Sequence, residues 1–462
     1  MSTSTRGGFG SKLGIILASA GTAVGLGNIW RFPTQAGENG GSAFILVYLL
    51  CIFCLGLPLM IAECVIGRHS RANTGSAFMI LAPGTNWKWL GRFSVFAAFL
   101  ILSYYNVVAG WTLAYLYDAV MGTFVELSHT VTTAGENAFA NNFMSFVSNP
   151  WKPILALIIF MGMSHFIIIR GVEKGIEKYS KILMPCLFII LVVLAISSLT
   201  MPGAKEGLYF LFHPDFEAIN SKVVLSALGQ CFFSLSLGMG CLCTYASYFR
   251  KDANLPKTAI SVALMDTFVA IMAGVIIFPA VFSVPGLVPN QGPSLVFIAL
   301  PNIFNETLSA TPFLAWLVPV LFYLLLVVAT VTSTISLHEV ITAFISETFG
   351  PSRHKAAIIV SVSTIALGCV CSLSMGPLGD IKISDMVIFD FFDFFTAKIM
   401  LPIAAFFISL FIGWKLKTRP LWVELTSHGT VRFRGLKLFL FAMRYLVPIL
   451  IFLVFLSELN II

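Results

Sequence analysis

Two glycine-containing stretches interrupt long apolar segments of this 462-residue chain. The first reads Gly21-Thr22-Ala23-Val24-Gly25-Leu26-Gly27-Asn28, and the second reads Leu237-Gly238-Met239-Gly240, shortly after Phe233, Ser234 and Ser236. A break in a helix frees N–H groups that attract an anion and C=O groups that can ligate a cation. Lipid cannot satisfy such groups, so each break predicts a protein-lined site at membrane depth. Two broken helices in corresponding halves are typical of a carrier with a central binding site.

The composition places these breaks in a helical membrane protein with several spans. Hydrophobic residues make up 58% of the chain, charged residues make up 11%, and the mean hydropathy is +0.92. This balance excludes a soluble enzyme. The net charge of +7 does not predict nucleic-acid binding, because no basic patch is interleaved with stacking aromatic residues. The nine cysteines lie mostly in apolar stretches, and we interpret them as small hydrophobic residues.

Apolar runs of about 20 residues predict eleven membrane spans. We expect them near residues 12–36, 41–66, 92–120, 153–170, 181–200, 221–247, 258–283, 313–346, 357–374, 385–413 and 438–460. The breaks fall in the first and sixth spans, so the chain divides into repeats over about 12–200 and 221–413. An odd number of spans in each half predicts two inverted five-helix repeats in a single transmembrane domain, 1–462, with an extra helix at 438–460.

Lysine and arginine are unevenly distributed between the loops. The loops near 121–150, 201–220 and 284–312 carry few of them, whereas most of the basic residues lie on the other side. The positive-inside rule therefore predicts a multi-pass protein of the cell inner (plasma) membrane with a cytoplasmic N terminus and an external C terminus. We expect no cleaved signal peptide, since the first apolar segment is long and lacks a small-residue cleavage site.

Several motifs resemble the neurotransmitter:sodium symporter family. The stretch from Gly25 to Pro33 (GLGNIWRFP), followed by 38–41 (ENGG), is similar to the signature of this family. Further matching blocks are Tyr104-Tyr105-Asn106 with Trp111, Gly229-Gln230, Ser236-Leu237-Gly238, Thr244-Tyr245-Ala246-Ser247-Tyr248, and Ala329 with Thr332-Ser333. They span most of residues 6–400 in the order of the family, and the eleven spans resemble its bacterial leucine-transporter-like amino-acid carriers. The resemblance implies sodium-coupled amino-acid symport by alternating access rather than an enzyme.

The resemblance also implies two sodium sites. The first would use the backbone of Ala23, the amide of Asn28, the hydroxyl of Ser234 and a side chain on the seventh span. The second would use the carbonyls of Gly21, Val24 and Ala329 with the hydroxyls of Thr332 and Ser333. Sodium prefers oxygen donors, and these groups supply them. The alternative for each hydroxyl is a hydrogen bond to its own helix.

The seventh span departs from the family pattern. It reads Leu264-Met265-Asp266-Thr267 where the family usually has asparagine. An ionisable group in the middle of a span is a functional-site hypothesis by default, so we predict that Asp266 ligates the first sodium. A one-residue slip would place Met265 there instead, and Asp266 could also be structural or exchange protons. With this carboxylate present we expect no chloride requirement.

Gly25 indicates the substrate class within the resemblance. Monoamine carriers of the family have aspartate at this position, so here the negative charge should come from the carboxylate of an amino-acid substrate. That carboxylate would meet the amides of Leu26 and Gly27, the hydroxyl of Tyr105 and the first sodium. The rest of the binding site would comprise Thr22, Ala23, Ile101, Phe233, Ser234, Ser236, Met239, Ser333 and Leu337. Its mainly apolar character favours hydrophobic and aromatic amino acids, although Ile101 and Leu337 could be ordinary packing residues.

The gates follow from the same resemblance. Arg31 resembles the arginine of the outer gate, with Asp393 as its partner in preference to Asp390, and Phe233 would cap the substrate. On the inner side Arg6 would pair with Glu347, near Tyr248. Ion pairs at the surface contribute only about 0–1 kcal/mol each, which suits gates that must open.

Three further residues are expected to support this machinery. Glu63 should hold freed N–H groups of the broken helices, while Gly175 and Pro185 resemble a pair that lets the start of the fifth span unwind. The alternatives to the whole interpretation are an ion channel, a membrane-embedded enzyme, and a transport-inactive amino-acid sensor of the same fold. No metal-ligand spacing or nucleophile motif favours the enzyme.

Overall fold

The computed structural model describes residues 7–129, 137–284 and 294–459, and it is helical almost throughout. The first half contains α1 (Lys12–Ala23), π-helical η1 (Gly27–Arg31), α2 (Phe32–Glu38), α3 (Ser42–Cys51), η2 (Ile52–Gly56), α4 (Leu57–Ser70), α5 (Thr74–Leu81), α6 (Lys88–Met121), α7 (Thr123–Ser128), α8 (Ala138–Val147), α9 (Lys152–Ile168), η3 (Val172–Glu177), α10 (Lys178–Leu199) and α11 (Ala204–Phe212).

The second half begins with the second broken helix. It contains α12 (Ser221–Ser234), α13 (Cys241–Ala246), α14 (Leu255–Phe282), η4 (Leu295–Ala299), α15 (Leu300–Thr307), α16 (Pro312–Phe349), α17 (Arg353–Leu373), α18 (Ile388–Asp393), η5 (Phe394–Met400), α19 (Leu401–Leu410), η6 (Phe411–Lys415), α20 (Thr418–Leu425), α21 (Leu436–Phe441), η7 (Ala442–Leu446) and α22 (Val447–Glu458). A short antiparallel pair, β1 (Lys382–Ile383) and β2 (Met386–Val387), precedes α18.

These helices match the predicted membrane spans. In the described part of the chain, eight helices are long and apolar enough to cross a membrane, and two bent pairs raise the number to ten. One bent pair is the first predicted span, in which 12–23 and 27–38 meet at 56°. Together α12 and α13 form a further interrupted segment at the sixth predicted span. The arrangement is compatible with the eleven predicted spans, of which the first and sixth are broken.

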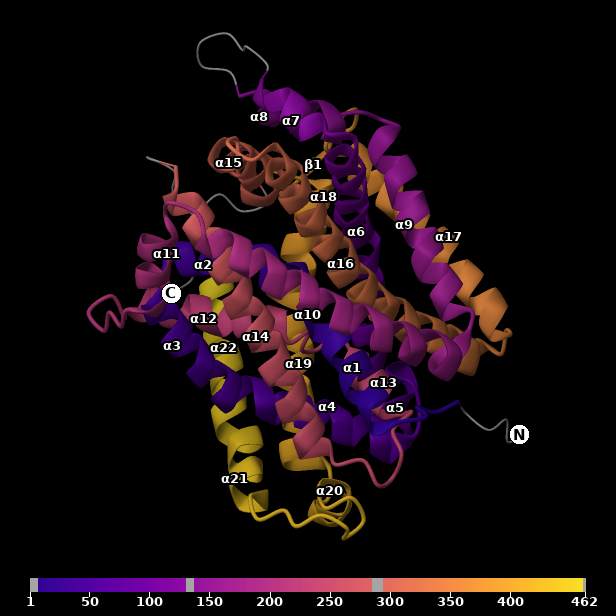
Figure 1. Ribbon diagram of the computed structural model, residues 1–462. Coiled ribbons are helices and arrows are strands. Elements are labelled where there is room, and N and C mark those ends of the chain that lie inside the picture. Colours follow the sequence, from indigo (N-terminus) through magenta and orange to yellow (C-terminus); the bar gives the residue numbers. More distant parts are fainter. Residues whose placement is uncertain (1–6, 130–136, 285–293, 460–462) are drawn as a thin grey trace.

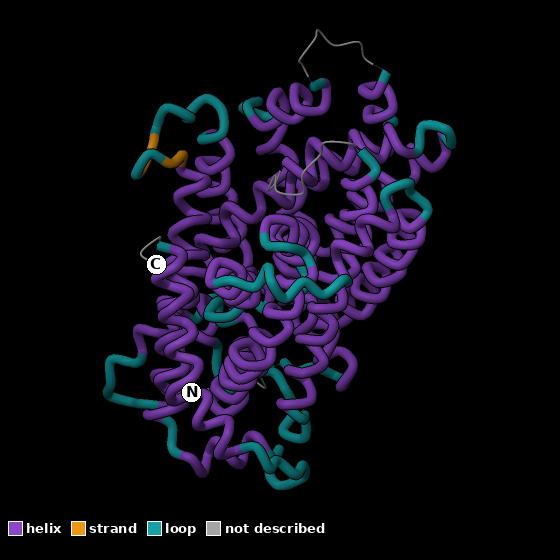
Figure 2. The backbone as a smooth tube through the Cα atoms, turned by 90° about the vertical axis from the view of Figure 1, so that its left-hand side faces the viewer, coloured by secondary structure: helices purple, strands orange, loops and turns teal. Residues whose placement is uncertain are grey.

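The broken helices lie inside a frame of longer ones. Helix α6 packs along α16 and α9, while α14 contacts α1, α10 and α11. Figure 1 shows α7, α8, α15 and β1 at one end of the molecule and α20 at the other, and the N-terminal segment lies toward the end with α20. Figure 2 shows the two strands near one end of the molecule as well. The two breaks therefore face each other in the core, away from both ends of the molecule.

Candidate functional site

The first break has a local cause in its residues. Helix α1 ends at Ala23, and Val24 leaves the helical conformation with ψ near 112°. The N–H of Gly25 donates to the side-chain Oδ1 of Asn28 at 2.9 Å. The N–H of Leu26 points to the hydroxyl of Tyr105, 3.5 Å away on α6. These side chains partner two of the N–H groups that the break frees, so the backbone is stable without lipid contact.

The second break contains three residues in the left-handed backbone region. Gly238 and Gly240 have φ near 84° and 77°, and Ser236 has φ near 53°. Glycine adopts this region at little cost, which explains both glycines. Glu63 on α4 accepts a hydrogen bond from the N–H of Gly238 at 2.7 Å. The predicted supporting role of Glu63 is therefore confirmed at the second break.

Polar side chains connect the two breaks. The hydroxyl of Ser236 donates to the carbonyl of Thr22 at 2.8 Å, so the second break partners a carbonyl of the first. The amide of Gln230 on α12 donates to the carbonyl of Gly27 at 3.1 Å. Both acceptors lie at the break between α1 and η1, so the halves of the molecule are joined through the groups that their broken helices expose.

A cavity of about 40 Å³ lies between the breaks. Every residue predicted to contact the substrate lines it: Thr22, Ala23, Leu26, Gly27, Ile101, Tyr105, Phe233, Ser234, Ser236, Met239, Ser333 and Leu337. Tyr104 and Cys241 also line it, and sequence reasoning missed both. A cavity of this size holds only a few water molecules, so a bulky ligand requires Phe233, Met239 or a neighbour to move.

Gly25 marks the most crowded part of this cavity. A Cβ atom at this position would lie 2.7 Å from the hydroxyl of Ser333 and 3.1 Å from that of Tyr105. These distances leave no room for any larger side chain unless the hydroxyls move. The space beside Gly25 is thus framed by two hydroxyls and by the N–H of Leu26, which are groups that hydrogen bond to a carboxylate.

The three side chains predicted for the first sodium site, those of Asn28, Ser234 and Asp266, meet around Asp266. Its carboxylate accepts hydrogen bonds from the amide of Asn28 at 2.7 Å and from the hydroxyl of Ser234 at 2.9 Å. The side chain of Asp266 is fully buried, whereas Met265 is only partly buried. The orientation of Asp266 toward both partners favours the predicted register over the one-residue slip.

Two details around Asp266 were not predicted. The hydroxyl of Tyr48 on α3 lies 3.3 Å from the carboxylate, and sequence reasoning missed this third donor. The amide of Asn28 directs its NH₂ group to Asp266 and its oxygen to Gly25. For its oxygen to ligate a cation beside Asp266, the side-chain amide must flip so that its oxygen and nitrogen exchange places. The ligand role of the Ala23 carbonyl stays a prediction.

The second predicted sodium site is a cluster of oxygen atoms between α1 and α16. The hydroxyl of Ser333 lies 3.0 Å from the carbonyl of Val24, 3.5 Å from that of Gly21 and 3.3 Å from that of Ala329. The hydroxyl of Thr332 donates to Ala329 of its own helix at 2.9 Å. All five predicted ligands are therefore neighbours. Since carbonyl and hydroxyl oxygens suit a hard cation, the donor set fits sodium.

On the outer side, Arg31 has a neighbour that was not predicted. The guanidinium lies 4.4 Å from the ring centroid of Phe233, as expected for a gate above that residue. Its Nη2 atom is 3.9 Å from Oε1 of Glu458, whose other oxygen is 3.0 Å from Nζ of Lys398. The predicted pairing with Asp393 stays a prediction, while in this structure Glu458 lies beside Arg31. The reason is that α22, outside the predicted repeats, packs on α12 and brings its last turn to Arg31.

An aromatic cluster surrounds Tyr248 on the inner side. Phe9 is buried and packs edge-on against Tyr245, Tyr248 and Phe249, with ring centroids 5.8–6.5 Å apart. Arg6 lies outside the described residues, so its pairing with Glu347 stays a prediction. The carboxylate of Glu347 accepts a hydrogen bond from Asn73 at 2.8 Å.

The surroundings of Tyr248 were not predicted either. Its hydroxyl donates to Glu339 at 2.8 Å, and Glu339 also forms an ion pair with Arg353.

Glu177 of η3 accepts hydrogen bonds from Gly10 at 2.6 Å and Ser11 at 2.7 Å. The N-terminal segment is thus tied to the start of the fifth span, which is π-helical rather than unwound at Gly175 in this structure.

Comparisons with known proteins identify the family. A model of the sodium:neurotransmitter symporter family matches residues 6–145 and 137–462. The chain belongs to the sodium:neurotransmitter symporter family. It is 37% identical to an uncharacterized sodium-dependent transporter, YhdH, of Bacillus subtilis (98% of this chain, 97% of that one). It is 28% identical to the sodium-dependent nutrient amino acid transporter 1 of Drosophila yakuba (80% of this chain, 66% of that one).

A solved structure of another protein has the same fold as this chain. The crystal structure of the transporter MhsT in complex with L-phenylalanine superposes with a TM-score of 0.87 and 45% sequence identity. The match covers 98% of this chain and all of that one. As a member of this family, the chain is a multi-pass, sodium-dependent membrane transporter with two inverted repeats whose first helices are broken.

Proposed function

We propose that this symporter couples the inward movement of sodium to the uptake of hydrophobic and aromatic L-amino acids by alternating access. The observation that carries the proposal is the cavity between the two breaks, which two clusters of oxygen atoms flank. One cluster is centred on Asp266 and the other on Ser333. Such an arrangement suits one zwitterionic ligand and two cations, because it offers separate donors to each.

The groups around Gly25 support an α-amino acid as the ligand. With no side chain at this position, the protein supplies no charge of its own between Ser333 and Tyr105. The substrate carboxylate provides that charge and binds to the hydroxyl of Tyr105, to the N–H groups of Leu26 and Gly27, and to the first sodium. The positive end of the half-helix that begins there adds to the attraction.

The apolar part of the cavity supports the preference for large hydrophobic side chains. Ile101, Phe233, Met239 and Leu337 supply four apolar contacts. Methionine adapts to ligands of different shape because its side chain is flexible and polarisable. MhsT has been crystallised with L-phenylalanine, which agrees with this preference.

Two sodium ions move with each substrate in this proposal. The first ion is held by Ala23, Asn28, Ser234 and Asp266. The second ion is held by Gly21, Val24, Ala329, Thr332 and Ser333. Asp266 provides the negative charge beside the first ion, so chloride is not required. With the N terminus in the cytoplasm and the C terminus outside, each charge moved inward gains about 2.3 kcal/mol per 100 mV of membrane potential.

Uptake of labelled amino acids into proteoliposomes tests the proposal. Phenylalanine, leucine, glycine, glutamate and lysine are compared with and without an inward sodium gradient. Sodium-dependent uptake of phenylalanine and leucine, and little uptake of the others, is the expected result. Current without any amino acid would indicate a channel, and binding without uptake would indicate a sensor. Either outcome overturns the proposal, as does a preference for glycine or glutamate.

A further inference from the structure

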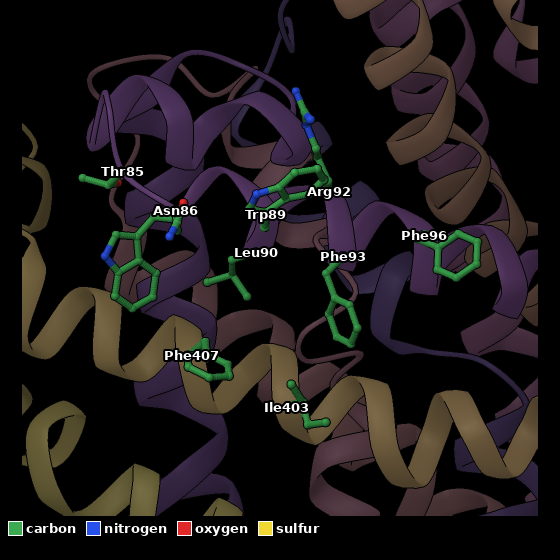
Figure 3. A pocket seen from close by; sticks show the side chains of 10 residues that line it. Thr85, Asn86, Trp89, Leu90, Arg92, Phe93, Phe96, Ile403 and Phe407 are labelled. Carbon is green, nitrogen blue, oxygen red and sulfur yellow. The ribbon is translucent and has the colours of Figure 1, made fainter.

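A large apolar groove lies between α6 and α19, and its lining residues differ from those of the central cavity. It has a volume of about 700 Å³, which is within the usual range for small-molecule sites. Figure 3 shows Leu90 and Phe93 of α6 opposite Ile403 and Phe407 of α19, with Trp89 and Arg92 at the rim. We call this feature the α6–α19 groove.

The groove lies at one boundary of the membrane. Helix α6 begins at Lys88 and is itself long and apolar enough to span a bilayer. The preceding segment is on the side of the N-terminal residues, because Arg71 donates to the carbonyl of Phe249, on which Phe9 packs. Tryptophan prefers the headgroup level of a bilayer, and Trp89 is 57% exposed here. The rings of Phe96 and Phe407 are exposed as well.

Two cations stand at the headgroup end of the groove. The guanidinium of Arg92 lies 5.1 Å and the ammonium of Lys88 5.8 Å from the ring centroid of Trp89. Neither forms an ion pair with any residue in the described part of the chain. The sequence has no Asp or Glu between residues 64 and 117. The rim therefore presents two positive charges without a carboxylate of its own to neutralise them.

A second groove adjoins the first. It has a volume of about 200 Å³ between α19 and α22, and Ile403 and Phe407 line both grooves. The side chain of Phe407 consequently contributes to two apolar channels that share residues of α19. A ligand with one anionic head and two apolar chains matches this arrangement, since each channel can hold one chain.

We propose that the α6–α19 groove binds one anionic glycerophospholipid from the leaflet on the N-terminal side. Arg92 and Lys88 hold its phosphate, Trp89 packs at the glycerol level, and the acyl chains lie on either side of Phe407. Basic pockets between membrane helices bind anionic headgroups in this way, and arginine matches phosphate geometry. Because α6 also carries Ile101 and Tyr105, the bound lipid holds a wall of the central cavity in place.

Lipid titration of the purified full-length protein in detergent tests the site. Native mass spectrometry compares phosphatidylglycerol with phosphatidylcholine of the same acyl chains. One phosphatidylglycerol should bind preferentially, and the double variant Lys88→Gln with Arg92→Gln should weaken its binding about tenfold. The matched control replaces Lys251 and Lys257, two exposed lysines outside the groove, by glutamine and should leave binding unchanged.

Brominated phosphatidylglycerol locates the bound lipid. Its quenching of tryptophan fluorescence should fall when Trp89 is replaced by phenylalanine and should not fall with Trp151→Phe, which removes another exposed tryptophan. Equal affinity for the two lipids, equal weakening by both double variants, or quenching that is insensitive to Trp89 would each overturn the proposal. All the substituted residues are exposed or at the rim, so folding is expected to be retained.

Discussion

At the residue scale, the chemistry depends on a buried carboxylate and an absent side chain. Asp266 accepts hydrogen bonds from Asn28, Ser234 and Tyr48, so the charge is placed against three donors from three different helices. Gly25 leaves the space between Ser333 and Tyr105 to the ligand. The first residue attracts a cation, and the second requires the ligand to bring its own negative charge.

Replacing Asp266 by alanine should weaken the sodium dependence of amino-acid binding. Loss of the carboxylate removes the negative charge beside the first proposed sodium ion. Because about 1.4 kcal/mol of lost attraction is a tenfold change in affinity, the half-saturating sodium concentration should rise about tenfold or more. Equilibrium binding of labelled phenylalanine over a sodium series measures it. Met265→Ala is the control. Unchanged sodium dependence in Asp266→Ala, or an equal change in the control, would remove Asp266 from the ligands.

Replacing Gly25 by alanine should impair amino-acid binding about tenfold or more, because the added Cβ would lie 2.7 Å from Ser333. Overfilling a packed site costs about 1–3 kcal/mol. The affinity for phenylalanine at saturating sodium measures this effect. Gly162→Ala is a matched control, since a Cβ there meets no atom within 4 Å. Wild-type affinity in Gly25→Ala would contradict the proposed position of the substrate.

At the element scale, the broken helices could be predicted but their outer partners could not. Glycine and polar residues inside an apolar run identify a break locally, and the family motifs assign the residues around it. Which helix lies beside Arg31 depends on long-range packing, and no local pattern predicted that α22 brings Glu458 there. Tyr48 was missed for the same reason, because one tyrosine in an apolar run resembles an ordinary core residue.

The contact between η1 and α22 yields a prediction about the outer gate. Glu458→Gln removes the ion pairs to Arg31 and Lys398, so bound phenylalanine should dissociate up to about fivefold faster, as expected for partly exposed pairs. Dissociation of labelled substrate from the purified protein measures this rate. Asp393→Asn provides the comparison. A larger acceleration in Asp393→Asn than in Glu458→Gln would restore the pairing that the family resemblance implies.

A buried ion pair joins the last turn of α4 to α20, and α20 lies outside the membrane spans. The Nε atom of Arg68 donates to Glu424 at 2.6 Å, and both side chains are buried. Burial alone would raise the pKa of Glu424, but the hydrogen bond with His69 and the charge of Arg68 outweigh it and hold the pKa below its ordinary value. A lowered folded-state pKa stabilises the protein above the unfolded pKa, and this contribution is lost as the pH falls through the folded value.

Glu424→Gln should therefore destabilise the protein at neutral pH. The stability of the variant should also fall less steeply than that of the wild type as the pH is lowered. Breaking a buried pair costs about 3–5 kcal/mol. Thermal unfolding in detergent between pH 7 and pH 3 measures the difference between variant and wild type, which should shrink toward low pH. Glu306→Gln, at an exposed carboxylate, should behave as wild type. A difference that does not depend on pH would contradict this assignment.

At the scale of the whole molecule, apolar length and glycine position were enough to predict the spans and the two interrupted helices. The charge asymmetry between the loops predicts the orientation of the chain in the membrane. The width of the cavity and the two lipid-facing grooves could not be predicted, because each depends on helices that meet only in the folded protein. The coupling of ions to substrate depends on the two breaks meeting.

Concentrative uptake tests that coupling most directly. Proteoliposomes with an inward sodium gradient and an inside-negative potential are given labelled L-phenylalanine, and the steady-state ratio of internal to external label is measured. The account predicts accumulation above the external concentration, which rises with the potential and disappears when an ionophore dissipates the sodium gradient. Accumulation that survives the loss of the gradient, or a ratio that never exceeds one, would contradict it.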